Sequence, residues 1–231
     1  MTWIPLNVHS QFSILDSTAS VTALAEKAKA HGISAIALTD QGNLYGAIDF
    51  YKACKAAGVK PILGCEIWLS PGSRFEKKRI LGVPNGFPLV LLAKDAKGYQ
   101  NLCKLSSLGF LEGFYYQPRI DRELLEKYSE GLICLSGPVS GKISYLILQG
   151  SEEEAIKEVE WFKALFGDRF YFELQRHAMT DEQIQQDGMD RESWVLQNLR
   201  DHTAAQQMVN AKLVEFSKRF SVKDRLYYRF R

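Results

Sequence analysis

The sequence predicts an α/β domain built on a barrel-like sheet with helices outside. Three observations support this. Over the first 150 residues, short apolar segments alternate with segments of helical apolar spacing. Glycines follow the predicted helices, and polar residues follow the predicted strands. A chain of 231 residues with 46% hydrophobic residues can bury a core, and no fixed-period repeat is found, so one domain is the simplest interpretation.

The elements can be assigned in order from residue 4. Residues 4–8 could form the first strand. A helix is predicted over 21–31, where Val21, Leu24, Ala25 and Ala28 share one face and Gly32 closes the helix. The further expected elements are a strand over 34–39, a helix over 45–57 and a strand within 60–69 that ends at Cys65 and Glu66, followed by a loop over 71–84.

The second half continues the alternation with less regularity. Residues 181–218 are polar and helix-prone, and no convincing strand follows them. The expected elements before them are strands over 89–93, 132–136 and 170–174 and helices over 98–108 and 151–166.

Composition excludes several classes of protein. The net charge of +2 is too small to argue for a nucleic-acid surface. The four cysteines are far apart and form no C-x-x-C pair, so neither a zinc ribbon nor a dense disulfide scaffold is indicated. We find no export signal and no apolar run of about 18 residues, which favours a cytoplasmic protein without membrane insertion.

Candidate reactive groups follow the predicted strands. His9 and Asp16 follow the first strand, Asp40 follows the second, and Glu66 lies at the end of the third. Loops after the strands of such a sheet share one rim, so their side chains converge. Histidine and carboxylates on one rim suit divalent metals, which activate a water or polarise a phosphoryl oxygen.

Each of these residues also has a structural interpretation. His9 could be a hydrogen-bonded structural residue, and Asp16 could cap a helix before Ser17. Asp40 could satisfy backbone donors in its turn. Glu66 is harder to explain in this way, because a carboxylate within an apolar segment needs a partner.

Several segments together resemble the PHP domain at the start of bacterial DNA polymerase III alpha subunits. The resemblance covers roughly residues 1–220, in matching order and spacing. The segments that carry it are VHSQFSILD (8–16), ALTDQGNLYG (37–46), KPILGCE (60–66), LLAK (91–94) with GYQNL (98–102), GFYY (113–116), GLICLSG (131–137) and FELQRH (172–177).

The resemblance implies a distorted seven-stranded (β/α) barrel whose rim, in intact members, binds a cluster of metal ions and hydrolyses phosphoesters, sometimes as a proofreading exonuclease. Four ligand positions depart from that pattern. Asn7 and Gln41 stand where family members carry histidines, Pro88 where a third histidine is usual, and Pro138 where a cysteine or histidine is usual. Amide oxygens bind zinc-like ions more weakly than imidazole, and proline has no side-chain donor.

His9, Asp16 and Glu66 therefore remain as a residual metal site, with Asp40 supporting them from behind. Three protein ligands leave at most one weakly bound divalent ion, Zn, Mn or Mg, and no other cofactor is expected. No catalytic residue is assigned, since each lost imidazole also removes a candidate general base.

The end of the chain departs from the family as well. An apolar strand with an Asp-x-His pair is expected after the last helix, and residues 221–231 show no such pair. We therefore assign residues 1–220 to the PHP domain and 221–231 to a divergent tail, with the closing strand of the barrel missing. The polymerase carboxylates of the family lie beyond this length.

Three functions follow from these observations. The first is a noncatalytic scaffold within DNA replication, with a polymerase body or replisome subunits as partners and only weak or indirect contact with DNA. The second is a metal-dependent phosphoesterase or 3′–5′ exonuclease with a reduced metal site. The third is a remnant that folds poorly, because an open barrel exposes a sheet edge.

Overall fold

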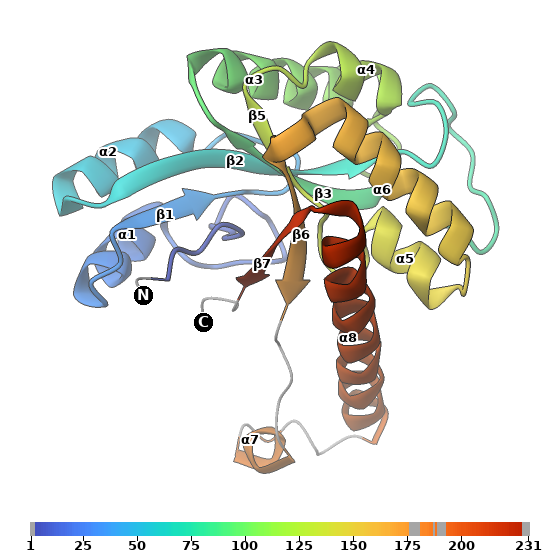
Figure 1. Cartoon of the computed structure of the whole chain (residues 1–231). Coiled ribbons are helices and arrows are strands. Elements are labelled where there is room, and N and C mark those ends of the chain that lie inside the picture. The colour runs from blue at the N-terminus through green and yellow to red at the C-terminus, as the bar shows by residue number, and fades with distance from the viewer. Residues whose placement is uncertain (1–2, 176–180, 187, 189–192, 228–231) are drawn as a thin grey trace.

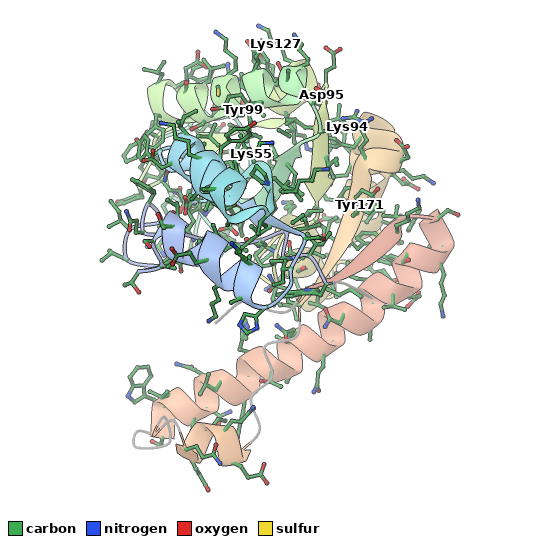
Figure 2. All side chains as sticks on the ribbon, turned by 90° about the vertical axis from the view of Figure 1, so that its left-hand side faces the viewer. Lys55, Lys94, Asp95, Tyr99, Lys127 and Tyr171 are labelled. Atoms are coloured by element: carbon green, nitrogen blue, oxygen red, sulfur yellow. The ribbon has the colours of Figure 1, made fainter. Side chains whose placement is uncertain are left out.

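The computed structural model describes residues 3–175, 181–186, 188 and 193–227. A curled sheet forms its centre, and helices cover the outside of the sheet (Figure 1). In the view turned by 90°, the long helix α8 reaches beyond the sheet (Figure 2). In chain order the elements are α1 Val21–Ala30, β1 Ala35–Leu38, α2 Ala47–Ala57, β2 Lys60–Leu69, β3 Phe87–Ala93, α3 Ala96–Leu111, β4 Arg119–Ile120, α4 Arg122–Lys127, β5 Leu132–Leu135, α5 Lys142–Leu148, α6 Glu152–Phe166, the 3₁₀ turn η1 Gly167–Arg169, β6 Phe170–Gln175, α7 Asp181–Gln186, α8 Ser193–Phe220 and β7 Lys223–Tyr227.

Over the described residues, the sheet has seven strands in the order β1-β2-β3-β5-β6-β7, with β4 paired to the end of β2. The predicted α/β class is therefore confirmed. Strand β3 runs antiparallel to both of its neighbours, whereas the other pairs are parallel. Strands β2 and β3 cannot pair in parallel, because the loop over 70–86 between them contains no crossover helix.

Strand β2 is shared between two parts of the sheet. Its first residues, Lys60–Leu63, pair with β1, and its second part, Gly64–Leu69, pairs with β3. A side chain at Gly64 would approach the carbonyl oxygen of Leu91 to 2.7 Å, so glycine allows the close contact at this change of partner. Glu66 consequently lies inside β2 and not at its end, which corrects the predicted boundary.

The expected first strand is not formed. Residues 3–8 lie along β1 in irregular conformation, and only two backbone hydrogen bonds tie them to it. The carbonyl of Pro5 accepts from the amide of Ala37 at 2.9 Å, and that of Val8 accepts from Thr39 at 2.8 Å. This segment still places His9 beside the end of β1.

The expectation that no strand follows residue 220 is also wrong. Strand β7 pairs in parallel with β6 over five residues, from Tyr171 opposite Lys223 to Gln175 opposite Tyr227. Among the described residues, β7 has no second partner, so the sheet stays open between β7 and β1. The predicted incomplete barrel is confirmed, although its open side lies beyond β7.

The two faces of the sheet differ in what covers them. The outward side chains of β2, β3, β5 and β6 pack against helices α3 to α6 and α8 in the largest core cluster. Helices α1 and α2 cover the outward residues of β1. A small cluster of Ala37, Val90, Leu92 and Leu135 fills the inner face. Because side chains alternate along a strand, Glu66 and Glu173 belong to this inner face.

Candidate functional site

The inner face of the sheet carries two buried carboxylates, Glu66 on β2 and Glu173 on β6. Glu66 pairs in register with Val90, an inner-face residue of β3. Glu173 alternates with Phe172 and Leu174, which belong to the outer core. Both carboxylates are buried, and the charge of Glu66 raises the pKa of Glu173 as a secondary contribution, which indicates that the two groups are close enough to interact.

Asp40 organises the loop that carries His9. Its carboxylate accepts hydrogen bonds from the Ser10 amide at 2.6 Å, from the Ser10 hydroxyl at 2.7 Å and from the Ser13 hydroxyl at 2.7 Å. The Ser13 hydroxyl also accepts from the Gln41 amide at 3.1 Å. The Asp40 carboxylate therefore supports the loop from behind. Among the described residues, its side chain makes no hydrogen bond or ion pair with His9 or Glu66, whereas the Asp40 carbonyl accepts from the Glu66 amide at 3.1 Å.

We predict that Asp40→Ala lowers the free energy of unfolding by about 2 kcal/mol, because it leaves a buried amide and two hydroxyls without their acceptor. Urea denaturation measures this loss. Asp49→Ala, an exposed carboxylate on α2, is the matched control and should cost less than about 1 kcal/mol. Equal losses for the two variants would contradict the organising role of Asp40.

His9 lies between the other two predicted ligands. Its Nδ1 is 2.5 Å from Oδ2 of Asp16, and its Nε2 is 3.5 Å from Oε2 of Glu66. At 3.5 Å the second contact is an ion pair, and Nε2 makes no hydrogen bond to a described residue. The structure thus brings His9, Asp16 and Glu66 together, with one carboxylate on each nitrogen of the ring.

The two carboxylates keep the imidazole charged. Burial alone would lower the pKa of His9, but the ion pair with Glu66, and then the hydrogen bond and attraction from Asp16, outweigh it and raise the pKa to about 9 from 6.5. The ring therefore carries a proton at neutral pH, and the imidazolium itself neutralises the carboxylates around it.

This pKa predicts a pH dependence of stability. Because the folded pKa lies above the unfolded one, the contribution of His9 is full below about pH 6.5 and is lost as the pH rises through 9. Urea denaturation at intervals from pH 8 to pH 10, above the pKa of Glu173, should show the upper part of this decline. In His9→Gln the decline over that window should disappear; its persistence would mean that another group causes it.

Glu173 is a site residue that the sequence analysis did not select. Its Oε1 accepts from Nδ2 of Asn7 at 3.3 Å and from Nε2 of Gln175 at 2.6 Å, whereas its buried Oε2 has no partner among the described residues. Burial raises the pKa of Glu173 to about 7. The signal was present, because Glu173 interrupts an apolar strand in the same way as Glu66.

The two amides Asn7 and Gln41 also take part in this cluster. Asn7 donates to Glu173 and accepts from the Thr39 hydroxyl at 3.0 Å, and Gln41 Nε2 donates to Oε1 of Glu66 at 3.4 Å. Pro88 lies on the inner side of β3, two residues before Val90, and Gly137 approaches its carbonyl closely. Amide N–H groups thus face the carboxylates in this rim.

The arrangement does not fit a metal cluster of the kind the resemblance implies. A metal ion needs several lone pairs directed at one point, but Asp16 and Glu66 lie at different nitrogens of the His9 ring. Within the described parts of the chain, no three His, Cys, Asp or Glu side chains converge as ligands. Arg176 and His177, which belong to the last quoted motif, lie outside the described residues.

The open barrel-like sheet, the helices outside it and the carboxylate-lined rim define an α/β domain of the incomplete (β/α) barrel type. The PHP domain family model matches residues 5–177, so the chain belongs to the PHP domain family. It is 48% identical over 222 residues to the DNA polymerase III subunit alpha of Chlamydia pneumoniae, and 52% identical over 182 residues to that of Borreliella burgdorferi. These matches cover 96% and 79% of this chain but only 18% and 16% of the relatives.

A solved structure, described as a metal-dependent phosphoesterase from Bifidobacterium adolescentis, is distantly similar. The alignment covers 98% of this chain and 87% of that one, with a TM-score of 0.43 and 12% sequence identity. Separately, none of the helices in the described residues combines the length and apolar character needed to cross a membrane.

Proposed function

We propose that this chain is a noncatalytic PHP domain of a DNA polymerase III alpha subunit-like protein and serves as a scaffold in bacterial DNA replication. One observation carries the proposal. The rim carboxylates are neutralised by the protein itself, since Asp16 and Glu66 share the His9 imidazolium and amides donate to Glu66 and Glu173. A rim balanced in this way has no need of a metal cluster for stability.

The proposal includes partners and surroundings. The polymerase body is the first partner, because the curated relatives are alpha subunits several times longer than this chain. Other replisome subunits could bind as well, contact with DNA through the rim would be weak or indirect, and the protein would act in the cytoplasm. Any bound cofactor is at most one weakly held Zn, Mn or Mg ion.

The second candidate function is a phosphoesterase or 3′–5′ exonuclease with a reduced metal site. One observation favours it, because Oε2 of Glu173 and Nε2 of His9 are both buried without a hydrogen bond. Buried polar atoms of this kind can mark the place of an ion or a water. The residues to test are therefore His9, Glu66 and Glu173.

Metal content and hydrolysis together test the two functions. The purified chain is analysed for metals and assayed on bis-p-nitrophenyl phosphate and on 3′-labelled single-stranded DNA, with Mn²⁺ or Zn²⁺ added. We expect well below one ion per chain and rates equal to those of Glu66→Gln. Hydrolysis that is lost in a folded Glu66→Gln, with Glu76→Gln as the exposed control, would overturn the scaffold proposal and support the alternative.

A further inference from the structure

The loop over 70–86 exposes an aromatic ring and a run of cations. Phe75 is 57% exposed, and its ring lies against the guanidinium of Arg74 at 4.3 Å. Lys78 and Arg79 follow at exposed positions, and no ion pair joins either of them to a described residue. The buried Arg74 side chain thus supports the Phe75 ring, and Lys78 and Arg79 can contact a ligand.

The turn after α3 exposes two further rings. Phe114 is 50% exposed and stacks on Phe110, with 6.2 Å between the ring centroids and 17° between the planes. Tyr116 is 82% exposed and adopts a positive φ of 61°, which a non-glycine residue rarely does. The rings of Tyr115 and Tyr116 pack edge to face, with 4.7 Å between their centroids. Both rings are held outward by their neighbours.

Loop and turn are fastened together by the buried side chain of Arg119. Its Nη2 donates to the carbonyl of Glu76 at 2.8 Å, and its Nε donates to the carbonyl of Gly113 at 3.1 Å. Asn85 Nδ2 donates to the carbonyl of Tyr115 at 2.5 Å. Figure 1 shows the loop running along one edge of the molecule between α4 and α5. The exposed rings and cations are therefore fixed in one region.

The charge of this region is positive. Of the nearby acidic groups, Glu112, Asp121 and Glu123 pair with Arg74, and the exposed Glu76 is outnumbered by the exposed Lys77, Lys78 and Arg79. The guanidinium of Arg119 donates only to carbonyl and amide oxygens among the described residues. Lys78 and Arg79 then add two exposed charges, so the surface attracts an anion that can also cover aromatic rings.

We propose that Phe75, Lys78, Arg79, Phe114 and Tyr116 form a binding surface for single-stranded nucleic acid. Unpaired bases stack on the exposed rings, and the phosphates contact the two cations. A duplex would offer phosphates but no free base faces, and an acidic polypeptide would use the cations but not the ring planes. The inference does not depend on the proposed function, because none of these residues touches the rim.

Fluorescence anisotropy with a labelled oligothymidylate of 20 nucleotides tests the surface on the full chain. Lys78→Ala/Arg79→Ala should weaken binding at least tenfold at low salt and reduce its salt dependence by about 1.4 in log–log slope, since each contact to a single strand contributes about 0.7. Phe114→Leu should weaken it about fivefold or more. Circular dichroism confirms that each variant folds.

Matched controls lie on α2 and at the start of β2. Lys52→Ala/Lys60→Ala removes two exposed charges, and Tyr51→Leu removes a ring that is 46% exposed; both should bind as the parent does. Absence of binding, equal losses in the controls, or equal affinity for a 20-base-pair duplex would overturn the proposal. Binding of a polyglutamate peptide that depends on Phe114 to the same degree would also overturn the proposal.

Discussion

Glu173→Gln is expected to stabilise the chain by about 3 kcal/mol more at pH 9 than at pH 4. Burial raises the pKa of Glu173 from 4.5 to about 7, so ionisation of this carboxyl destabilises the folded state. Since the folded pKa lies above the unfolded one, stability is lost as the pH rises from 4.5 through 7, by about 1.4 kcal/mol per unit of pKa. Glutamine keeps the shape and the acceptor oxygen and cannot ionise.

Urea denaturation of parent and variant at pH 4, 6 and 9 measures this difference. The control is Glu153→Gln, which replaces an exposed carboxylate at the start of α6 by a carboxamide. Its effect on the free energy of unfolding should differ little between the three pH values. The decline assigned to His9 lies at higher pH, between about 6.5 and 9, so the two groups are separable. A constant effect of Glu173→Gln at every pH would show that its carboxylate is not desolvated.

Arg74→Met is expected to lower the free energy of unfolding by about 3–5 kcal/mol, because it leaves the buried carboxylate of Asp121 without a cation. Nε of Arg74 donates to Glu112 at 2.6 Å, and Nη1 donates to both oxygens of Asp121 at 3.0 Å. Burial would lower the pKa of Arg74, but its hydrogen bonds to Glu112, Glu123 and Asp121 more than offset this and raise it. The guanidinium therefore stays charged.

Two further variants isolate the charge of this cluster. Arg74→Met/Asp121→Asn should recover part of the lost stability, since it removes the buried charge together with its partner. Lys212→Met breaks more exposed ion pairs with Glu152 and Glu215 and should cost much less stability than Arg74→Met. A loss in Arg74→Met no greater than in Lys212→Met would show that the buried cluster contributes no more than a surface pair.

Local pattern was sufficient for the long elements of the fold. Helices α1 and α6 and strand β2 repeat their apolar residues at the spacing of their final structure, so their predicted bounds lie within a few residues of those observed. Helices α4 and α5 were missed because six or seven residues are too few to show a period. Strand β7 was missed because its pairing with β6 bridges a long separation along the chain.

The candidate site, like the fold, could be predicted from the sequence only in part. Residue type and position after the strands were enough to select His9, Asp16 and Glu66, which the fold does bring together. Glu173 was passed over although it interrupts an apolar strand just as Glu66 does. Its isolated oxygen and its contact with Asn7 arise between residues 166 positions apart, which no local pattern records.

The sequence by itself determined the α/β class and the order of the main elements, because these depend on residue type and short-range spacing. Only the tertiary structure decided that the His9 ring lies between two carboxylates and that amides donate to both glutamates. Such contacts depend on strand direction, register and the bend at Gly64, which are fixed by packing across the whole domain.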